Sequence, residues 1–169
     1  TFLDTNKTWV IAGWGAMSNI QGNENCITDV QTNARHYFQR PDAEHLGVDS
    51  NATALTGFAT RINLNKQRGN VIFNAAFGLI DPRFEASDLG YLSRGDVINY
   101  HVGAGYQWTE PNHFYRKFNL ILAHTLGMDC GGNLTNNGIM NLGYIQFSNY
   151  YWIDYGSGYF WETYDTRLT

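Results

Sequence analysis

Apolar and polar residues alternate along this chain over unusually long stretches. In residues 71–80, the odd-numbered positions are all apolar, from Val71 to Leu79, whereas the even-numbered ones include Asn74 and Gly78. A period of two indicates β-strands that keep one face in an apolar medium and the other in a polar one. No comparable run of apolar residues has helical spacing, so we expect helix to be a minor component.

The alternation divides the chain into about eight expected strands, near residues 7–20, 27–40, 51–65, 70–80, 94–109, 116–129, 138–149 and 152–164. A strand that crosses a bilayer needs about 9–11 residues, whereas strands of soluble proteins usually have about 5–6. The exterior of a soluble barrel would need many charges, but only 15% of the residues are charged. We therefore predict an all-β, antiparallel, up-and-down transmembrane β-barrel over residues 1–169, either a complete small barrel or an arc of a larger one.

The same alternation assigns the two faces of the expected barrel wall. We expect the apolar series to point outward to lipid; it comprises Phe73, Phe77, Leu79, Ile98, Tyr100, Val102, Tyr106, Leu120 and Leu122. We expect the polar series to point into the lumen; it comprises Arg61, Asn63, Asn74, Asn99, His101 and Gln107. A soluble barrel, which has its apolar face inside, would show the reverse assignment.

The expected connections alternate in length, as they do in outer-membrane barrels. Residues 65–70 and 109–115 form short links, residues 81–93 form a long one, and residues 130–137 are intermediate. Aromatic residues gather near the ends of the expected strands, where an interfacial girdle would lie. Packing of these rings inside a soluble sheet is the alternative explanation.

Composition excludes several other classes of protein. With 43% apolar residues, the chain is not expected to be disordered, and its net charge of −4 argues against binding of nucleic acid. The longest stretch without a polar side chain, residues 9–17, is far shorter than the roughly 20 residues of a spanning helix. Cys26 and Cys130 lack zinc-ligand spacing, which leaves one disulfide or two free thiols.

The densest group of charges lies in the long connection and is our candidate ligand-binding or lumen loop. With one histidine of the neighbouring strand, its residues are Asp81, Arg83, Glu85, Asp88, Arg94, Asp96 and His101. We expect the two arginines of this loop to pair with its carboxylates and to fix it at the barrel mouth. The same groups are suited to contact a polar solute, and variation of Arg94 would then alter binding or flux.

Motifs for catalysis or metal binding do not occur in recognisable form. The acidic spacing of residues 81–96 does not match an EF-hand calcium loop. No HExxH sequence and no ordered nucleophilic triad occurs. We therefore predict no catalytic residue, no metal and no cofactor.

Three stretches resemble one bacterial outer-membrane family. They read YFQRPDAEHLGVD, RINLNKQRGNVIFNAAFGLIDPRFEASDLGYLSRGDVINYHVGAGYQW and YDTRLT, and the most specific piece is FEASDLGYLSR at residues 84–94. Members of that family carry a carbohydrate-binding family-9-like domain followed by a C-terminal β-barrel of uncharacterised function. The resemblance runs from about Tyr37 to Thr169 and implies that this chain is part of the barrel.

Two main functional classes follow, both placed in the bacterial outer membrane. The favoured one is a non-enzymatic barrel that serves as a channel, a receptor or a platform, with carbohydrate-related solutes as candidate ligands. Its expected partners are the lipid bilayer, a polar solute and further strands or domains of the same protein, but no nucleic acid. The alternative is a barrel hydrolase of the omptin or phospholipase kind, which a histidine–carboxylate pair on the rim would favour. A soluble β-sheet lectin is a third, weaker possibility.

Overall fold

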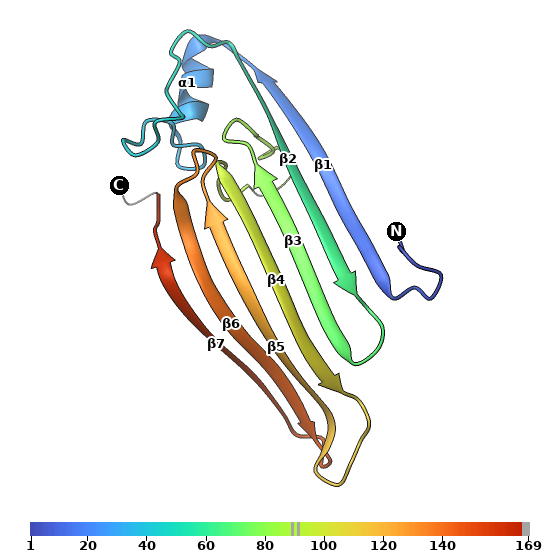
Figure 1. Cartoon of the computed structure of the whole chain (residues 1–169). Helices are drawn as coiled ribbons and strands as arrows, with labels where there is room; N and C mark the ends of the chain where they lie inside the picture. Colours follow the sequence, from blue (N-terminus) through green and yellow to red (C-terminus); the bar gives the residue numbers. More distant parts are fainter. Residues whose placement is uncertain (89, 91, 167–169) are drawn as a thin grey trace.

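A computed structural model of the chain describes residues 1–88, 90 and 92–166, and it is dominated by one antiparallel sheet (Figure 1). The sheet holds seven strands in the order of the sequence: β1 Trp9–Gln21, β2 Ala54–Lys66, β3 Val71–Ile80, β4 Val97–Trp108, β5 Tyr115–Met128, β6 Leu134–Phe147 and β7 Trp152–Thr163. The prediction of an all-β, up-and-down, antiparallel sheet is therefore confirmed. The sheet is open, with β1 and β7 at its two edges.

One predicted strand is wrong, because residues 27–40 form a helix and turns instead. The helix α1 spans Glu24–Thr32, and the side chain of Asn23 caps it by accepting a hydrogen bond from the Cys26 N–H. Ile27 and Gln31 lie four residues apart on its buried side, which is helical spacing. The Gln31 amide then bonds to the backbone N–H and carbonyl of Asp49, at 2.8 and 3.0 Å, and so fixes the chain that follows.

The strand register separates the two predicted sets of side chains onto opposite faces. Directly opposed residues of neighbouring strands share a face, and Arg61 lies opposite Gly78, which lies opposite Asn99. Phe77 lies opposite Tyr100 on the other side of the sheet. When the pairing is followed from strand to strand, all nine residues predicted to face outward lie on one face, which we call the apolar face. All six predicted lumen residues lie on the opposite face, which we call the polar face.

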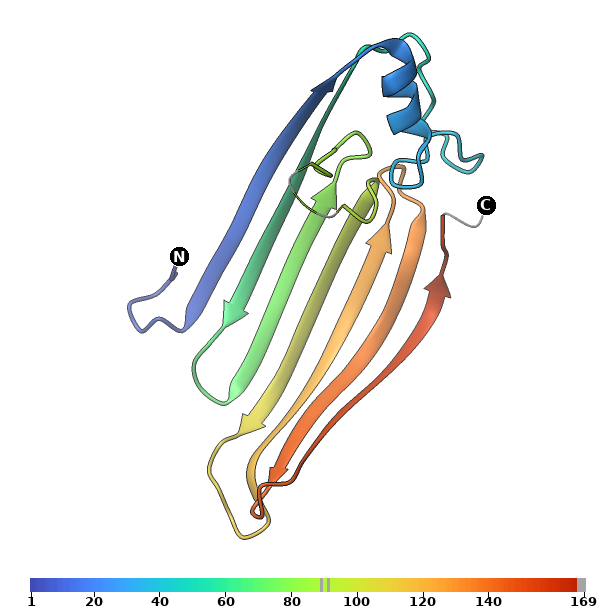
Figure 2. The same cartoon turned by 180° about the vertical axis from the view of Figure 1, so that it is seen from behind.

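Residues 81–96 form a long connection and residues 67–70 and 109–114 form short ones, as predicted, whereas the link 129–133 is no longer than the turn 109–114. Residues 22–53, 81–96 and 129–133 lie together at one end of the sheet, whereas the short turns 67–70, 109–114 and 148–151 lie at the other (Figures 1 and 2). We call residues 22–53 and 81–96 together the cap. No helix in the described ranges is long and apolar enough to cross a membrane.

The cap packs onto the polar face of the sheet. Phe84 and Leu92 form a small buried cluster with Ala59 of β2. The Glu85 N–H donates a hydrogen bond to the Ser18 hydroxyl of β1, at 2.9 Å. Gly57 of β2 permits this approach, because a Cβ there would lie only 2.2 Å from the Phe84 nitrogen. The contact between cap and sheet therefore holds a buried apolar cluster of the described residues.

Candidate functional site

A buried arginine links the two segments of the cap to the end of β5. Arg40 Nη2 lies 2.8 Å from Asp96 Oδ2 and 2.7 Å from Asp129 Oδ2. Asp42 Oδ1 is 3.5 Å from Arg40 Nε. Arg40, Asp96 and Asp129 are 6%, 3% and 0% exposed. Because a buried charge is costly unless it is paired, the three groups depend on one another.

Further donors complete the surroundings of the two carboxylates. Asp96 Oδ1 accepts from the Cys130 N–H at 2.9 Å and lies 3.0 Å from His45 Nε2. Asp129 accepts from the backbone and side-chain N–H groups of Asn133 at 2.8 and 3.0 Å. Burial alone would raise the pKa of Asp129, but these hydrogen bonds and the nearby positive charges lower it below its usual value.

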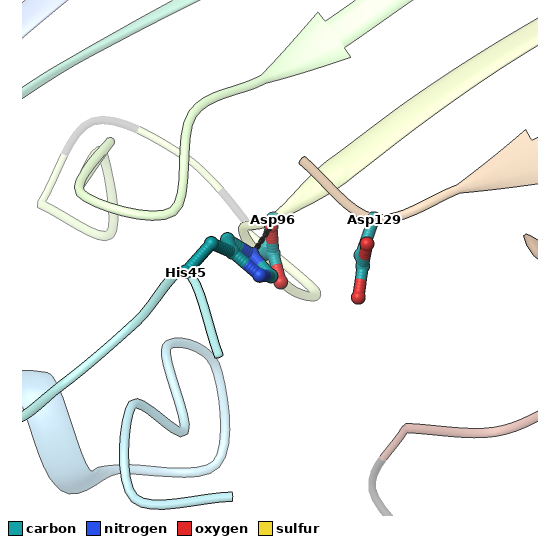
Figure 3. A group of neighbouring side chains, drawn as sticks. All are labelled: His45, Asp96 and Asp129. Atoms are coloured by element: carbon teal, nitrogen blue, oxygen red, sulfur yellow. Dashed lines mark hydrogen bonds and ion pairs between the residues drawn. The ribbon is translucent and has the colours of Figure 1, made fainter. Parts of the chain in front are cut away.

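His45, Asp96 and Asp129 come close enough to resemble a metal-binding group (Figure 3). One ligand atom of each lies within 4.8 Å of the others. The guanidinium of Arg40, however, donates to both carboxylates and already supplies their positive charge. These side chains therefore fit an ion-paired cluster better than a metal centre.

A second polar link joins residues 35–36 to the loop 81–96. His36 Nε2 lies 2.9 Å from Glu85 Oε2, and its Nδ1 lies 2.7 Å from the Pro82 carbonyl oxygen. Each ring nitrogen of His36 therefore faces a fixed oxygen atom of the loop. Burial acts to raise the pKa of Glu85, but hydrogen bonds from Ser87 and His36 outweigh it and lower the pKa to about 2. Glu85 is therefore held as a carboxylate within the cap.

The structure divides the predicted loop residues between structural and exposed positions. Glu85 and Asp96 belong to the two links just described, and Asp81 Oδ1 accepts from the Arg83 N–H at 2.8 Å within a turn. Arg83 and Asp88 are exposed. His101 lies away from the loop, on the polar face of β4, where its ring bonds to Asn74.

The expected pairing of Arg83 and Arg94 with the loop carboxylates is wrong for the described residues. Arg94 instead lies 4.0 Å from Asp165 and donates to the Thr166 hydroxyl at 2.5 Å. Glu85 and Asp96 take their basic partners from residues 35–45, and residues 35–40 were predicted as the end of a strand. His36 and Arg40 were missed for this reason and His45 because it lay in a connection, although the charge density of RHYFQRPDAEH was visible in the sequence.

The polar face below the cap holds a second group of polar side chains. Asn74 of β3 donates to Asn63 at 3.5 Å and also to Asn65, both on β2. Arg61 and Asn99 share the cross-strand row next to that of Asn63, on the side of the cap. The four strands β1 to β4 contain no Asp or Glu. Over strands β1 to β4, this face therefore combines amides with an arginine and carries no carboxylate.

Residues 4–165 match the model of a family described as a domain of unknown function, DUF5916. The chain belongs to this family. No curated protein and no solved structure gives a match. Membership in DUF5916 covers nearly all of the described sheet and cap, but the family description assigns no activity to them.

Proposed function

We propose that this DUF5916 chain forms part of the wall of a bacterial outer-membrane β-barrel. The barrel acts as a channel, receptor or platform for polar, carbohydrate-related solutes. The observation that carries this proposal is the exposed apolar face of seven long strands, opposite a polar face that holds the cap. A neighbouring carbohydrate-binding family-9-like domain, implied by the sequence resemblance, would supply the link to carbohydrate.

The apolar face is large, and many of its side chains are exposed in the described part of the chain. Exposed side chains follow one another across it, among them Met17, Phe58, Ile62, Phe77, Val102, Leu120, Leu122, Ile139 and Tyr159. A typical monomer exposes no continuous apolar patch beyond a few hundred Å². The strands have 10 to 14 residues, which meets the requirement of about 9–11 for crossing the hydrocarbon. Lipid is the medium that suits both features.

The two edge strands support an arc of a larger barrel. Every residue of β7 is exposed, and a bilayer contains no water to satisfy the free backbone groups of an edge. On the other edge, the amino group of Thr1 donates to the Ile11 carbonyl at 2.8 Å, and the Ile11 N–H donates back at 2.9 Å. Residues 1–3 thus run antiparallel along β1, in the position of a further strand.

The hydrolase is the second candidate, because two histidine–carboxylate pairs lie in the cap. His36 is 3% exposed and both its ring nitrogens face fixed acceptors, so substrate has no access to it. His45 is more open, with 22% of its side chain exposed. The nearby thiol of Cys130 is not an activated nucleophile, because burial and the Asp96 carboxylate raise its pKa to about 12. The non-enzymatic function is therefore favoured.

A lipid-contact experiment tests the proposal. In a variant lacking both native cysteines, Leu122→Cys on the apolar face and Asn99→Cys on the polar face each receive a fluorophore. Both native side chains are exposed, so the two sites form a matched pair. In vesicles that contain brominated phospholipids, we expect strong quenching at residue 122 and little at residue 99. Equal quenching, or stronger quenching at residue 99, would contradict a lipid-facing apolar surface.

A further inference from the structure

An arginine on the polar face has no partner among the residues that the structure describes. Arg61 is half-buried on β2, and no hydrogen bond or ion pair reaches its side chain from residues 1–88, 90 or 92–166. Strands β1 to β4 offer it no carboxylate. The charge of this guanidinium is therefore available to a molecule from outside.

Two exposed side chains lie in the same cross-strand row as Arg61. Trp14 lies directly opposite it on β1 and is 53% exposed. On the other side, Gly78 separates Arg61 from Asn99. A Cβ added at Gly78 would lie 2.9 Å from Asn99 Oδ1 and 3.8 Å from Arg61 Nη1. The amide and the guanidinium thus come together above a residue that has no side chain.

The two rows farther from the cap offer no such free groups, because their polar side chains already bond to one another. The Asn74 amide donates to Asn63 and Asn65, and its oxygen is bonded to the ring of His101. Those side chains form a structural ladder. In the row between this ladder and the cap, the side chains of Trp14, Arg61 and Asn99 have no hydrogen bond from another described side chain.

We propose that Trp14, Arg61 and Asn99 form a binding subsite for a sugar that carries a carboxylate. A guanidinium offers a planar fork that matches a carboxylate. An exposed indole presents a wide apolar surface to the C–H face of a sugar ring, and an amide both donates to and accepts from hydroxyl groups. A cation is excluded by the charge of Arg61. The subsite rests on the proposed function, since solute must reach the polar face.

Binding of an oligogalacturonate and of a neutral galactose oligosaccharide of equal length tests the subsite. The full protein in detergent micelles is titrated with each sugar by calorimetry. We expect the charged sugar to bind more tightly, and Arg61→Gln to weaken its binding about tenfold with little effect on the neutral sugar. Trp14→Ala should weaken both. Arg68→Gln, which removes the same charge from the exposed turn 67–70, should change neither.

The two proposals fail in distinguishable ways. Unchanged binding in Arg61→Gln, or equal affinity for both sugars, would overturn the subsite while the quenching at residue 122 stayed strong. Stronger quenching at residue 99 would overturn the lipid-facing assignment itself. The quenching experiment, repeated in the Arg61→Gln background, shows whether that variant is folded and inserted. A binding loss that accompanies lost insertion would count against a specific role for Arg61.

Discussion

Gly57→Ala should release the cap from the sheet while leaving the strands intact. The added Cβ would lie 2.2 Å from the Phe84 nitrogen, 2.3 Å from the Arg83 carbonyl carbon and 2.6 Å from the Phe84 Cα. These are backbone atoms, so no change of rotamer relieves the contact. The loop 81–96 must move away by more than about 1 Å to restore ordinary van der Waals separation.

The magnitude follows from what that movement disrupts. Phe84 would leave its packing against Ala59 and Leu92, and burial of a phenylalanine side chain contributes about 1.5–3 kcal/mol. The hydrogen bond from the Glu85 N–H to Ser18 would also be lost, at about 1 kcal/mol. We expect the closed cap to be destabilised by about 3 kcal/mol, roughly a hundredfold in its opening equilibrium.

Hydrogen–deuterium exchange measures this effect segment by segment. Residues 81–96 should exchange much faster in Gly57→Ala, whereas β4 and β5 should be unchanged. Gly15→Ala on the neighbouring strand is the matched control, because its Cβ would meet nothing within 4 Å. Equal protection of residues 81–96 in both variants would refute the close approach of loop and strand.

The remaining predictions concern the ionic cluster and the thiols. Arg40→Met should destabilise the cap by about 3–5 kcal/mol, because Asp96 and Asp129 would be left buried without a counter-charge. Chemical denaturation, monitored by hydrogen–deuterium exchange of residues 22–53, measures this loss of stability. In maleimide labelling at pH 8, exposed Cys26 should react readily and Cys130 slowly, since the pKa of Cys130 is raised to about 12. Mass spectrometry of the two peptides over time gives the rates, and equal rates would contradict the prediction.

The sheet was predictable because alternation is a local signal. A residue such as Tyr100 is apolar and its neighbour Asn99 polar, and this pattern continues through β4 without reference to any other part of the chain. The register then follows, because a slip by one residue would move every apolar side chain to the other face. The turn 67–70 was also predictable from its local sequence, because Gly69 has a φ of +83°, a backbone conformation that favours glycine.

The cap was not predictable in the same way, because its contacts join segments far apart in sequence. Arg40 reaches Asp96 and Asp129 across 56 and 89 residues, and no period in the sequence reports such a contact. The helix was missed because Ile27 and Gln31 are its only buried residues, too few to form a recognisable apolar series. The candidate loop was located correctly, but its arginines were assigned partners that the structure gives to residues 35–45.

Acid should loosen the cap through Glu85. Its pKa is lowered from 4.5 to about 2 in the folded protein, so its carboxylate stabilises the cap fully above pH 4.5 and loses this effect as the pH falls toward 2. At about 1.4 kcal/mol for each pKa unit, the contribution is about 3 kcal/mol. Protonation would weaken the contact of Glu85 with His36 at 2.9 Å, which loosens the link between residues 81–96 and residues 35–36.

A spin label at Ser93, which is exposed on the loop, should gain mobility between pH 4.5 and 2. The same label at Gln67, on the opposite end of the sheet, should not respond over this range. Glu85→Gln should make the loop label mobile already at neutral pH and flatten its acid response. Asp129 also has a lowered pKa, so the difference between the two proteins isolates the part due to Glu85. Identical acid profiles with and without the Glu85 carboxylate would show that Glu85 does not hold the cap.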